Sequence, residues 1–154
     1  MKKLVKLFLI VTVFVFSITL VNAGNIKGKE LGMGKDLMGV INVMAYGYSV
    51  KVFINGVDIG ITGGKSESLR LFGKEHSMAP QLPEDMKNLA CLKAGENEIK
   101  VEYQRMKDVD STGLTVELKS EEQFSSDENL FYFREEPDKN GETKSITKKF
   151  ILEY

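Results

Sequence analysis

The sequence predicts an all-β fold, an antiparallel β-sandwich of about eight short strands, and three observations support this prediction. Apolar and polar residues alternate with a period of two in several short segments. An Asn-Gly pair at positions 55–56 joins two such segments, as in a tight hairpin. Turn residues also recur at regular spacing along the chain, which is typical of sandwiches with jelly-roll or immunoglobulin-like topology.

The first 23 residues have the three-part order of a secretory signal peptide. A basic segment over 1–6 precedes an apolar run from Leu7 to Leu20, and small residues follow up to Ala23. This order predicts cleavage after Ala23 and a single domain over 24–154, with an uncleaved membrane anchor as the alternative. No cysteine stands at the cleavage point for a lipid anchor. The predicted product is therefore exported, to the periplasm or the extracellular space, with no stable membrane anchor.

The charge and the cysteine content limit which partners and which disulfides are possible. The chain has 21 Lys and Arg against 22 Asp and Glu, and removing the three lysines of the leader leaves 18 against 22, a net charge near −4. Because binding to a nucleic-acid backbone needs clustered positive charge, this balance argues against nucleic acid as a partner. The single cysteine, Cys91, allows no intrachain disulfide. Its apolar neighbours predict a buried thiol, with a dimer-linking disulfide as the alternative.

The clearest strands surround the Asn-Gly turn. The preceding segment, 37–48, is almost uncharged, and its Val, Ile and Gly content favours a strand over a buried helix. Strands over 50–54 and 57–61 then form the predicted hairpin, whose two-residue loop fixes the register. Six branched aliphatic residues share one face, in the facing pairs Ile54–Val57, Val52–Ile59 and Val50–Ile61. The other face carries Lys51, Phe53, Asp58 and Gly60.

The later elements follow from the same rules. A short helical turn is predicted near 83–90, because a proline and two acidic residues stand at its start. The aromatic segment 129–134 is predicted to be a strand buried on both faces. The remaining predicted strands cover 68–72, 98–103, 114–118 and, after a turn at 138–141, 145–154.

Two motifs resemble ligand loops but are better explained as turns. Residues 60–66 end in Gly-Gly-Lys-Ser, yet the first glycine of a phosphate-binding loop is replaced by Ile59 and no helix is predicted to follow. Asp108 and Asp110 have the opening spacing of a calcium loop, but Lys119 stands where the loop needs a glutamate. A turn accounts for these residues, and calcium at the two aspartates stays open.

Few residues are candidates for catalysis. His76 is the only histidine and lies in a predicted solvated loop, and Cys91 is expected to pack rather than attack. Adjacent carboxylates at 121–122 and 135–136 are typical of solvated turns. The sequence therefore predicts no catalytic residue, no metal site and no cofactor. The expected protein is not an enzyme, and a small hydrolase is the least favoured alternative.

Aromatic residues near the hairpin provide the candidate ligand-binding site. Tyr46 and Tyr48 precede the hairpin and Phe53 lies on its more polar face, where exposed rings could stack on a sugar or a peptide. The alternative is that a neighbouring strand or loop covers them. These rings predict an exported binding module that contacts carbohydrate or another envelope or extracellular protein. A structural or assembly subunit, joined by strand addition at an edge formed by 142–154, is the other hypothesis.

Two phrases of the sequence are familiar in combination. They read V-F-I-N-G-V-D-I-G at 52–60 and L-K-A-G-E-N-E-I-K-V at 92–101. Together they are similar to the galactose-binding-like jelly-roll module, such as the sugar-binding domain of β-galactosidases. Both are fold signatures, a hairpin turn and a polar turn that leads into a core strand. The family usually carries a tryptophan near the hairpin and this chain has none, so the resemblance implies a β-sandwich and transfers no binding residue.

Overall fold

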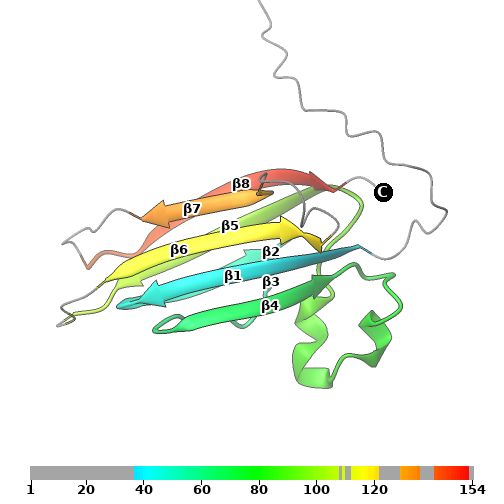
Figure 1. Ribbon diagram of the computed structural model, residues 1–154, viewed down its shortest axis with the longest axis horizontal. Coiled ribbons are helices and arrows are strands. Elements are labelled where there is room, and N and C mark those ends of the chain that lie inside the picture. Colours follow the sequence, from blue (N-terminus) through cyan, green and yellow to red (C-terminus); the bar gives the residue numbers. More distant parts are fainter. Residues whose placement is uncertain (1–36, 108, 110–111, 122–128, 136–140, 153–154) are drawn as a thin grey trace, which may run out of the picture.

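The computed structural model describes residues 37–107, 109, 112–121, 129–135 and 141–152. Within these residues, eight strands form two four-stranded antiparallel sheets packed face to face, which confirms the predicted all-β sandwich (Figure 1). The strands are β1 (Met38–Tyr46), β2 (Tyr48–Ile54), β3 (Val57–Asp58), β4 (Ser66–Phe72), β5 (Gly95–Arg105), β6 (Gly113–Ser120), β7 (Phe131–Glu135) and β8 (Lys144–Leu152).

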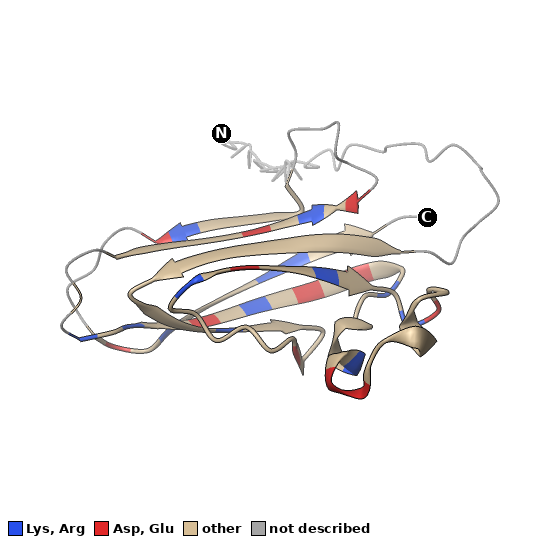
Figure 2. Ribbon diagram, turned by 60° about the horizontal axis from the view of Figure 1, so that its bottom comes forward, with Lys and Arg blue, Asp and Glu red and all other residues tan. Residues whose placement is uncertain are grey.

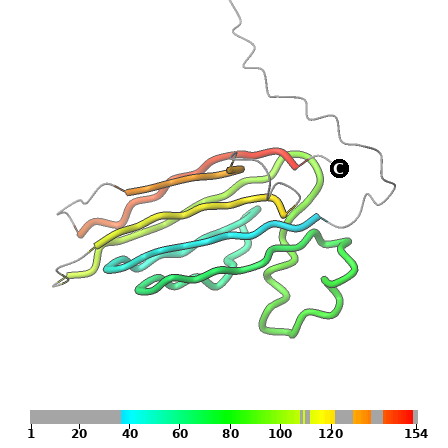
Figure 3. Tube along the Cα trace, in the orientation of Figure 1, coloured from blue at the N-terminus to red at the C-terminus, as the bar shows by residue number. Residues whose placement is uncertain are grey.

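The strands of each sheet come from distant parts of the chain. Sheet A has the order β4-β1-β6-β7, and sheet B has the order β3-β2-β5-β8. The β2–β3 and β6–β7 connections join neighbours within one sheet, whereas the other connections cross between the sheets (Figure 3). The division is four and four, whereas a constant-type immunoglobulin domain divides seven strands four and three.

The Asn-Gly hairpin forms as predicted at its turn. Asn55 and Gly56 have φ angles of 51° and 79°, the left-handed values that a type I′ turn needs. Two of the predicted facing pairs are present, Ile54 with Val57 in the strand register and Val52 with Ile59 through a 3.1 Å hydrogen bond. The aliphatic face of this hairpin lies in the core as expected, with Val57 alone half-buried.

The third predicted pair of the hairpin is wrong. The Val50 N–H donates to the Thr62 carbonyl at 3.1 Å rather than facing Ile61, and Ser49 bridges Gly63. One extra residue therefore stands on this side of the hairpin, as in a β-bulge. Gly60 supplies the necessary backbone freedom with a φ of 85°. Ile61 is nevertheless buried in the core.

The segment predicted as one strand over 37–48 is divided between the two sheets. β1 ends at Tyr46, Gly47 has a φ of 70°, and β2 begins at Tyr48. The Gly47 carbonyl accepts a 2.8 Å hydrogen bond from Met106 N–H, which fixes the corner. Because glycine adopts this φ without a Cβ clash, one residue carries the chain from sheet A to sheet B. Tyr46 and Tyr48 consequently belong to different sheets.

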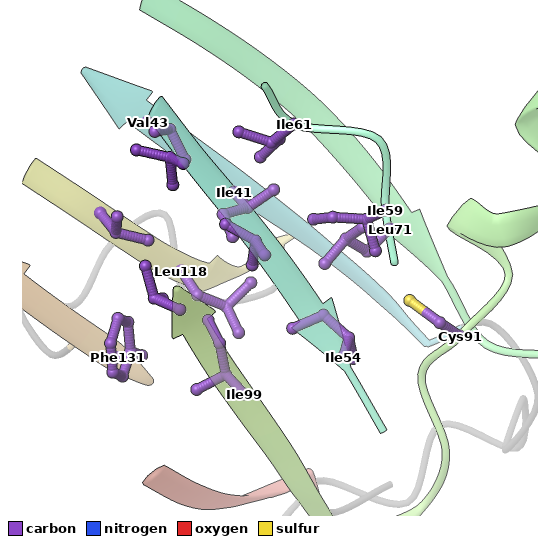
Figure 4. Close-up of a cluster of buried hydrophobic side chains, with 14 of the residues drawn as sticks. Ile41, Val43, Ile54, Ile59, Ile61, Leu71, Cys91, Ile99, Leu118 and Phe131 are labelled. Atoms are coloured by element: carbon purple, nitrogen blue, oxygen red, sulfur yellow. The ribbon is translucent and has the colours of Figure 1, made fainter. Parts of the chain in front are cut away.

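The core lies between the sheets and is built from alternate residues of each strand. Ile41 and Val43 of β1 meet Ile54 of β2 and Ile99 of β5, all without exposed surface (Figure 4). Full burial of each such side chain contributes about 1.5–3 kcal/mol. Cys91 lies at one end of this cluster (Figure 4). The period-two alternation of the sequence is therefore the pattern that separates core from surface.

β7 differs from its prediction. Phe131 is buried, but Tyr132 is 53% exposed, so the strand is not buried on both faces. The physical reason is that β7 is the edge strand of sheet A, and no other described element covers the outer face of this sheet. The predicted turn at 138–141 lies outside the described residues except for Gly141.

The connection between β4 and β5 holds two short 3-10 helices, η1 (Ala79–Gln81) and η2 (Glu84–Leu89). The second confirms the helical turn predicted near 83–90. Pro83 stands immediately before it and two acidic residues occupy its first turn. A parallel bridge between Gly73 and Leu92 brings the two ends of this connection together beside the sandwich (Figure 1).

Candidate functional site

The three rings predicted as a ligand site lie in three different places. Tyr46 is 53% exposed on the outer face of sheet A. Tyr48 is 2% exposed and points into the core, where its ring centroid lies 6.3 Å from that of Tyr103. Phe53 is half-buried on the outer face of sheet B, with the Lys100 ammonium 5.7 Å from its ring centroid. The structure does not bring these rings together, and Tyr48 offers no surface for stacking.

A different set of side chains shares the outer face of sheet A. Met44 and Tyr46 of β1 are 49% and 53% exposed, and Tyr132 of β7 is 53% exposed. Arg134 of β7 points outward with Tyr132. We call these four residues the tyrosine face. Tyr46 stands opposite Gly113 of β6, where a Cβ would have no neighbour within 4 Å, so the side of the ring toward β6 is open.

Along β1, the tyrosine face is bordered by uncharged polar side chains. Ser66, Ser68 and Thr115 flank β1 in the register, and the Ser68 hydroxyl donates to Asn42 Oδ1 at 2.8 Å. β1 itself carries no charged residue along its whole length (Figure 2). The face thus combines exposed rings and a thioether with hydroxyl and amide groups.

The outer face of sheet B is of the opposite kind. β5 carries Glu and Lys at alternate positions (Figure 2), and these side chains form ion pairs within β5 and with β8. Lys100 lies 2.6 Å from Glu102, and Lys149 of β8 lies 2.8 Å from Glu96. The hydrogen bond from Lys149 lowers the pKa of the Glu96 carboxyl, and the same contact raises the pKa of Lys149. The charges on this face neutralise one another.

The glycine-rich loop over 60–66 is a turn, as predicted. Its Thr62 and Gly63 N–H groups both donate to Glu67 Oε2 at 3.3 Å, and Lys65 lies 3.4 Å from Oε1 of the same carboxylate. A strand, β4, follows instead of the helix that a phosphate-binding loop needs. The chain's own carboxylate therefore occupies the backbone donors that an anion would use.

The environment of His76 was predicted wrongly. The side chain is 5% exposed instead of solvated, because the connection between β4 and β5 folds over it. Its Nδ1 accepts a 2.9 Å hydrogen bond from Met78 N–H, and its ring packs edge-on against Phe72 at 5.1 Å. These contacts give the histidine a structural role in the connection.

Cys91 is buried, as predicted, and is a free thiol. Burial raises the pKa of this thiol to about 12, so it stays protonated at physiological pH. Elsewhere in the described chain, no group of three or more His, Cys, Asp or Glu side chains is placed to hold a metal ion. The calcium candidates Asp108 and Asp110 lie outside the described residues.

The two phrases that resemble the galactose-binding-like module meet in space. Asn55 Nδ2 donates to Asn97 Oδ1 and to the Cys91 carbonyl, each at 2.8 Å, and Glu98 N–H donates to Asn55 Oδ1 at 3.0 Å. Asn97 is 1% exposed and exchanges hydrogen bonds with the backbone of Lys93 in both directions. In this chain the two phrases lock the hairpin turn to the start of β5.

A second polar group closes the other end of the sandwich. The Tyr103 hydroxyl donates to Glu135 Oε2 at 2.9 Å, and Lys144 lies 3.1 Å from Oε1. Burial, followed by this contact with Glu135, raises the pKa of Tyr103 to about 12. The buried Tyr48 hydroxyl has no hydrogen-bond partner among the described residues. This end of the sandwich therefore holds two tyrosine rings, of which only Tyr103 has a hydrogen bond from its hydroxyl among the described residues.

Met44, Tyr132 and Arg134 are the residues of the tyrosine face that the sequence interpretation misses, and the last two lie in the segment 129–134. The segment was predicted to be buried on both faces because four of its residues are apolar or aromatic. Alternation alone could have found them, since Phe131 and Phe133 fall on one face and Tyr132 and Arg134 on the other.

Comparisons of the chain with protein-family models, with curated proteins and with solved structures find no match. Among the residues that the structure describes, no helix has the length and hydrophobicity to cross a membrane.

Proposed function

We propose that this protein is an exported carbohydrate-binding module that binds its ligand on the tyrosine face and does not convert it. The observation that carries the proposal is the pair of half-exposed rings, Tyr46 and Tyr132, on one face of a rigid sheet. Aromatic rings provide a flat apolar surface for the C–H face of a sugar at low entropic cost, because a tyrosine ring has few rotatable bonds.

The groups between and beside the rings support a sugar over a protein partner. Asn42, Ser68 and Thr115 supply hydroxyl and amide groups that can exchange hydrogen bonds with sugar hydroxyls. A stable protein interface needs roughly 800 Å² on each partner with an apolar centre. The described part of this face offers three large exposed apolar side chains, those of Met44, Tyr46 and Tyr132.

Export is part of the proposal and rests on the leader over 1–23. Its basic start, apolar run and small-residue end are the features that signal peptidase recognises. Expression of the full gene in a bacterial host should release a chain that starts at Gly24, which intact mass and amino-terminal sequencing will show. Recovery of the chain in the membrane fraction with Met1 retained would contradict export.

An assembly role through strand addition is the alternative, and the edge of sheet B weighs against it. β8 is an edge strand with Ile151 56% exposed, which suits a template for a further strand. However, Lys148 and Lys149 stand in its middle. Lysines on an edge strand oppose pairing with another strand, and self-pairing about Lys148 would set like charges opposite each other.

The test is a glycan array probed with the exported protein and with three alanine variants. Tyr46→Ala and Tyr132→Ala should each abolish the signal, while Phe53→Ala should retain it because Phe53 lies on the outer face of sheet B. Unfolding temperatures of all three variants should stay close to that of the parent. Loss of binding in Phe53→Ala alone would move the site to sheet B, and a parent protein that binds no glycan would overturn the proposal.

A further inference from the structure

Among the described residues, the ion pairs on the outer face of sheet A leave one cation, Arg134, without an ion-pair partner. Glu117 and Lys119 are neighbours on β6 at 3.1 Å, and Arg70 pairs with Glu121 at 3.2 Å. Arg134 is exposed and forms no ion pair with any described residue. Within the described chain, the tyrosine face therefore has a local excess of one positive charge on a protein whose predicted exported form is acidic overall.

Arg134 lies between the two rings in the strand register. It stands opposite Thr115, which in turn stands opposite Met44. Tyr132 is two residues away on the same strand. Tyr46 and Tyr132 are separated by two strand spacings, about 10 Å, and by four register positions along the strands, about 13 Å. A short chain of sugars that spans both rings must therefore pass over Thr115 and beside the Arg134 guanidinium.

We propose that the ligand of the tyrosine face is an acidic oligosaccharide, one whose sugars carry carboxylates as in uronic acids. This inference rests on the proposed function and specifies its ligand class. Arg134 binds the carboxylate through its planar fork of N–H donors, which matches a carboxylate in two parallel hydrogen bonds. Tyr46 and Tyr132 stack on sugars at the two ends. The arginine thus sets the specificity, and the rings supply the contact area.

The uncharged character of β1 strengthens the role of Arg134. No carboxylate of β1 competes for the guanidinium, and the nearest acidic residue in the register, Glu117 opposite Tyr132, is already paired with Lys119. On the outer face of sheet B, by contrast, Lys100 and Lys149 are already paired with Glu102 and Glu96, so these two cations are less available to an anion.

The experiment compares one ligand in two charge states. Oligogalacturonate and its fully methyl-esterified form have the same sugar rings, and their dissociation constants for the exported protein can be measured by biolayer interferometry. The acidic form should bind about tenfold more tightly, the gain expected for a charge-assisted hydrogen bond of about 1.4 kcal/mol. This preference should decrease in high salt, because the site is exposed.

Two variants with the same change in net charge isolate Arg134. Arg134→Gln should bind both forms equally, with the affinity of the parent for the ester. Lys51→Gln removes one positive charge from the exposed outer face of sheet B and should keep the tenfold preference. Because both side chains are exposed, neither substitution should change the unfolding temperature.

The outcomes separate this inference from the proposed function. Equal affinity of the parent for the acid and the ester, with binding lost in Tyr46→Ala, would overturn the acidic ligand and leave the carbohydrate site intact. Equal loss of preference in Arg134→Gln and Lys51→Gln would show that net charge acts instead of Arg134, which also overturns the inference. Polyglutamate should bind far more weakly than oligogalacturonate, and comparable binding would show that the face recognises anions without sugars.

Discussion

The two sheets have similar inner faces and very different outer faces. Inside, each sheet presents a row of branched aliphatic residues that meets the row of the other. Outside, β1 of sheet A has no charged residue, whereas β5 of sheet B carries Glu96, Glu98, Lys100 and Glu102 at alternate positions. Folding constrains the inner rows more strongly than the outer rows, because the inner rows are removed from water. The outer rows are free to differ, and their difference indicates where a ligand binds.

The outer face of sheet B has few charged groups that are free to bind a partner. Its lysines and glutamates pair along and across the strands, so few groups remain for a partner. On the tyrosine face, by contrast, the rings of Tyr46 and Tyr132 are half-exposed. Exposing large apolar rings to water is unfavourable, and the fold does not need these rings at those positions.

The largest effect is expected when a lysine replaces an inner residue of β1, compared with a lysine at the neighbouring outer position. Val43→Lys should lower the free energy of unfolding by more than about 3 kcal/mol, since it buries an unpaired charge. Met44→Lys, one residue along, should change it by less than about 0.5 kcal/mol because Met44 faces water. Urea unfolding measures both. Similar losses in the two variants would show that β1 has no solvent-facing row.

Asn97 is a polar exception on the inner face of sheet B. Asn97→Ala should lower the free energy of unfolding by about 1–3 kcal/mol, because the part-buried Lys93 N–H and one N–H of the Asn55 amide lose their acceptor. The control is Asn42→Ala on the outer face of sheet A, which removes one exposed hydrogen bond to Ser68 and should have little effect. An Asn97 variant as stable as the control would contradict the lock between the hairpin and β5.

Two tyrosines on the inner face of sheet B should respond differently to loss of their hydroxyls. Tyr103→Phe should lower the free energy of unfolding by about 1–2 kcal/mol, since Glu135 loses its donor. Tyr48→Phe should leave stability unchanged or raise it, because the Tyr48 hydroxyl is buried without a partner in the described chain. Thermal unfolding of the pair decides the matter, and a larger loss in Tyr48→Phe would reveal a partner for that hydroxyl.

Alkaline pH should weaken the fold through Cys91. The pKa of the thiol is about 12 in the folded protein against 9.0 ordinarily, so between these values the unfolded chain ionises first and gains stability. The free energy of unfolding should therefore be unaffected below pH 9 and fall as pH rises above it. Tyr103 titrates in an overlapping range, so the measurement is made in Tyr103→Phe with and without Cys91→Ala. Equal slopes would rule out the thiol as a cause.

The smallest effect is expected on the outer face of sheet B. Glu96→Gln and Lys149→Gln each break a fully exposed ion pair, and neither should shift the unfolding temperature measurably. Adding salt to the parent should be equally without effect at this site. A clear loss in both variants would mean that the charged face contributes to folding and that the two outer faces are not equally free.

The candidate site was only partly accessible from the sequence. Tyr46 is an exposed ring, as predicted, but Tyr48 and Phe53 do not share its face although they are close to it along the chain. Gly47 turns the chain between the sheets, which places residues two positions apart on different layers. Tyr132 is far from Tyr46 in sequence and shares its face because β6 pairs with both β1 and β7.

Most of the strands, the hairpin turn at Asn55 and Gly56, and the burial of Cys91 could be predicted from the sequence alone. These depend on local rules, the period of two along a strand and the left-handed φ of one turn. Only the tertiary structure decided the bulge after Ile59, the burial of His76 and the residues that meet on each outer face. The alternation of residues within one strand indicates which of its side chains point to the same face. The pairing of strands from distant parts of the chain decides which of those side chains become neighbours.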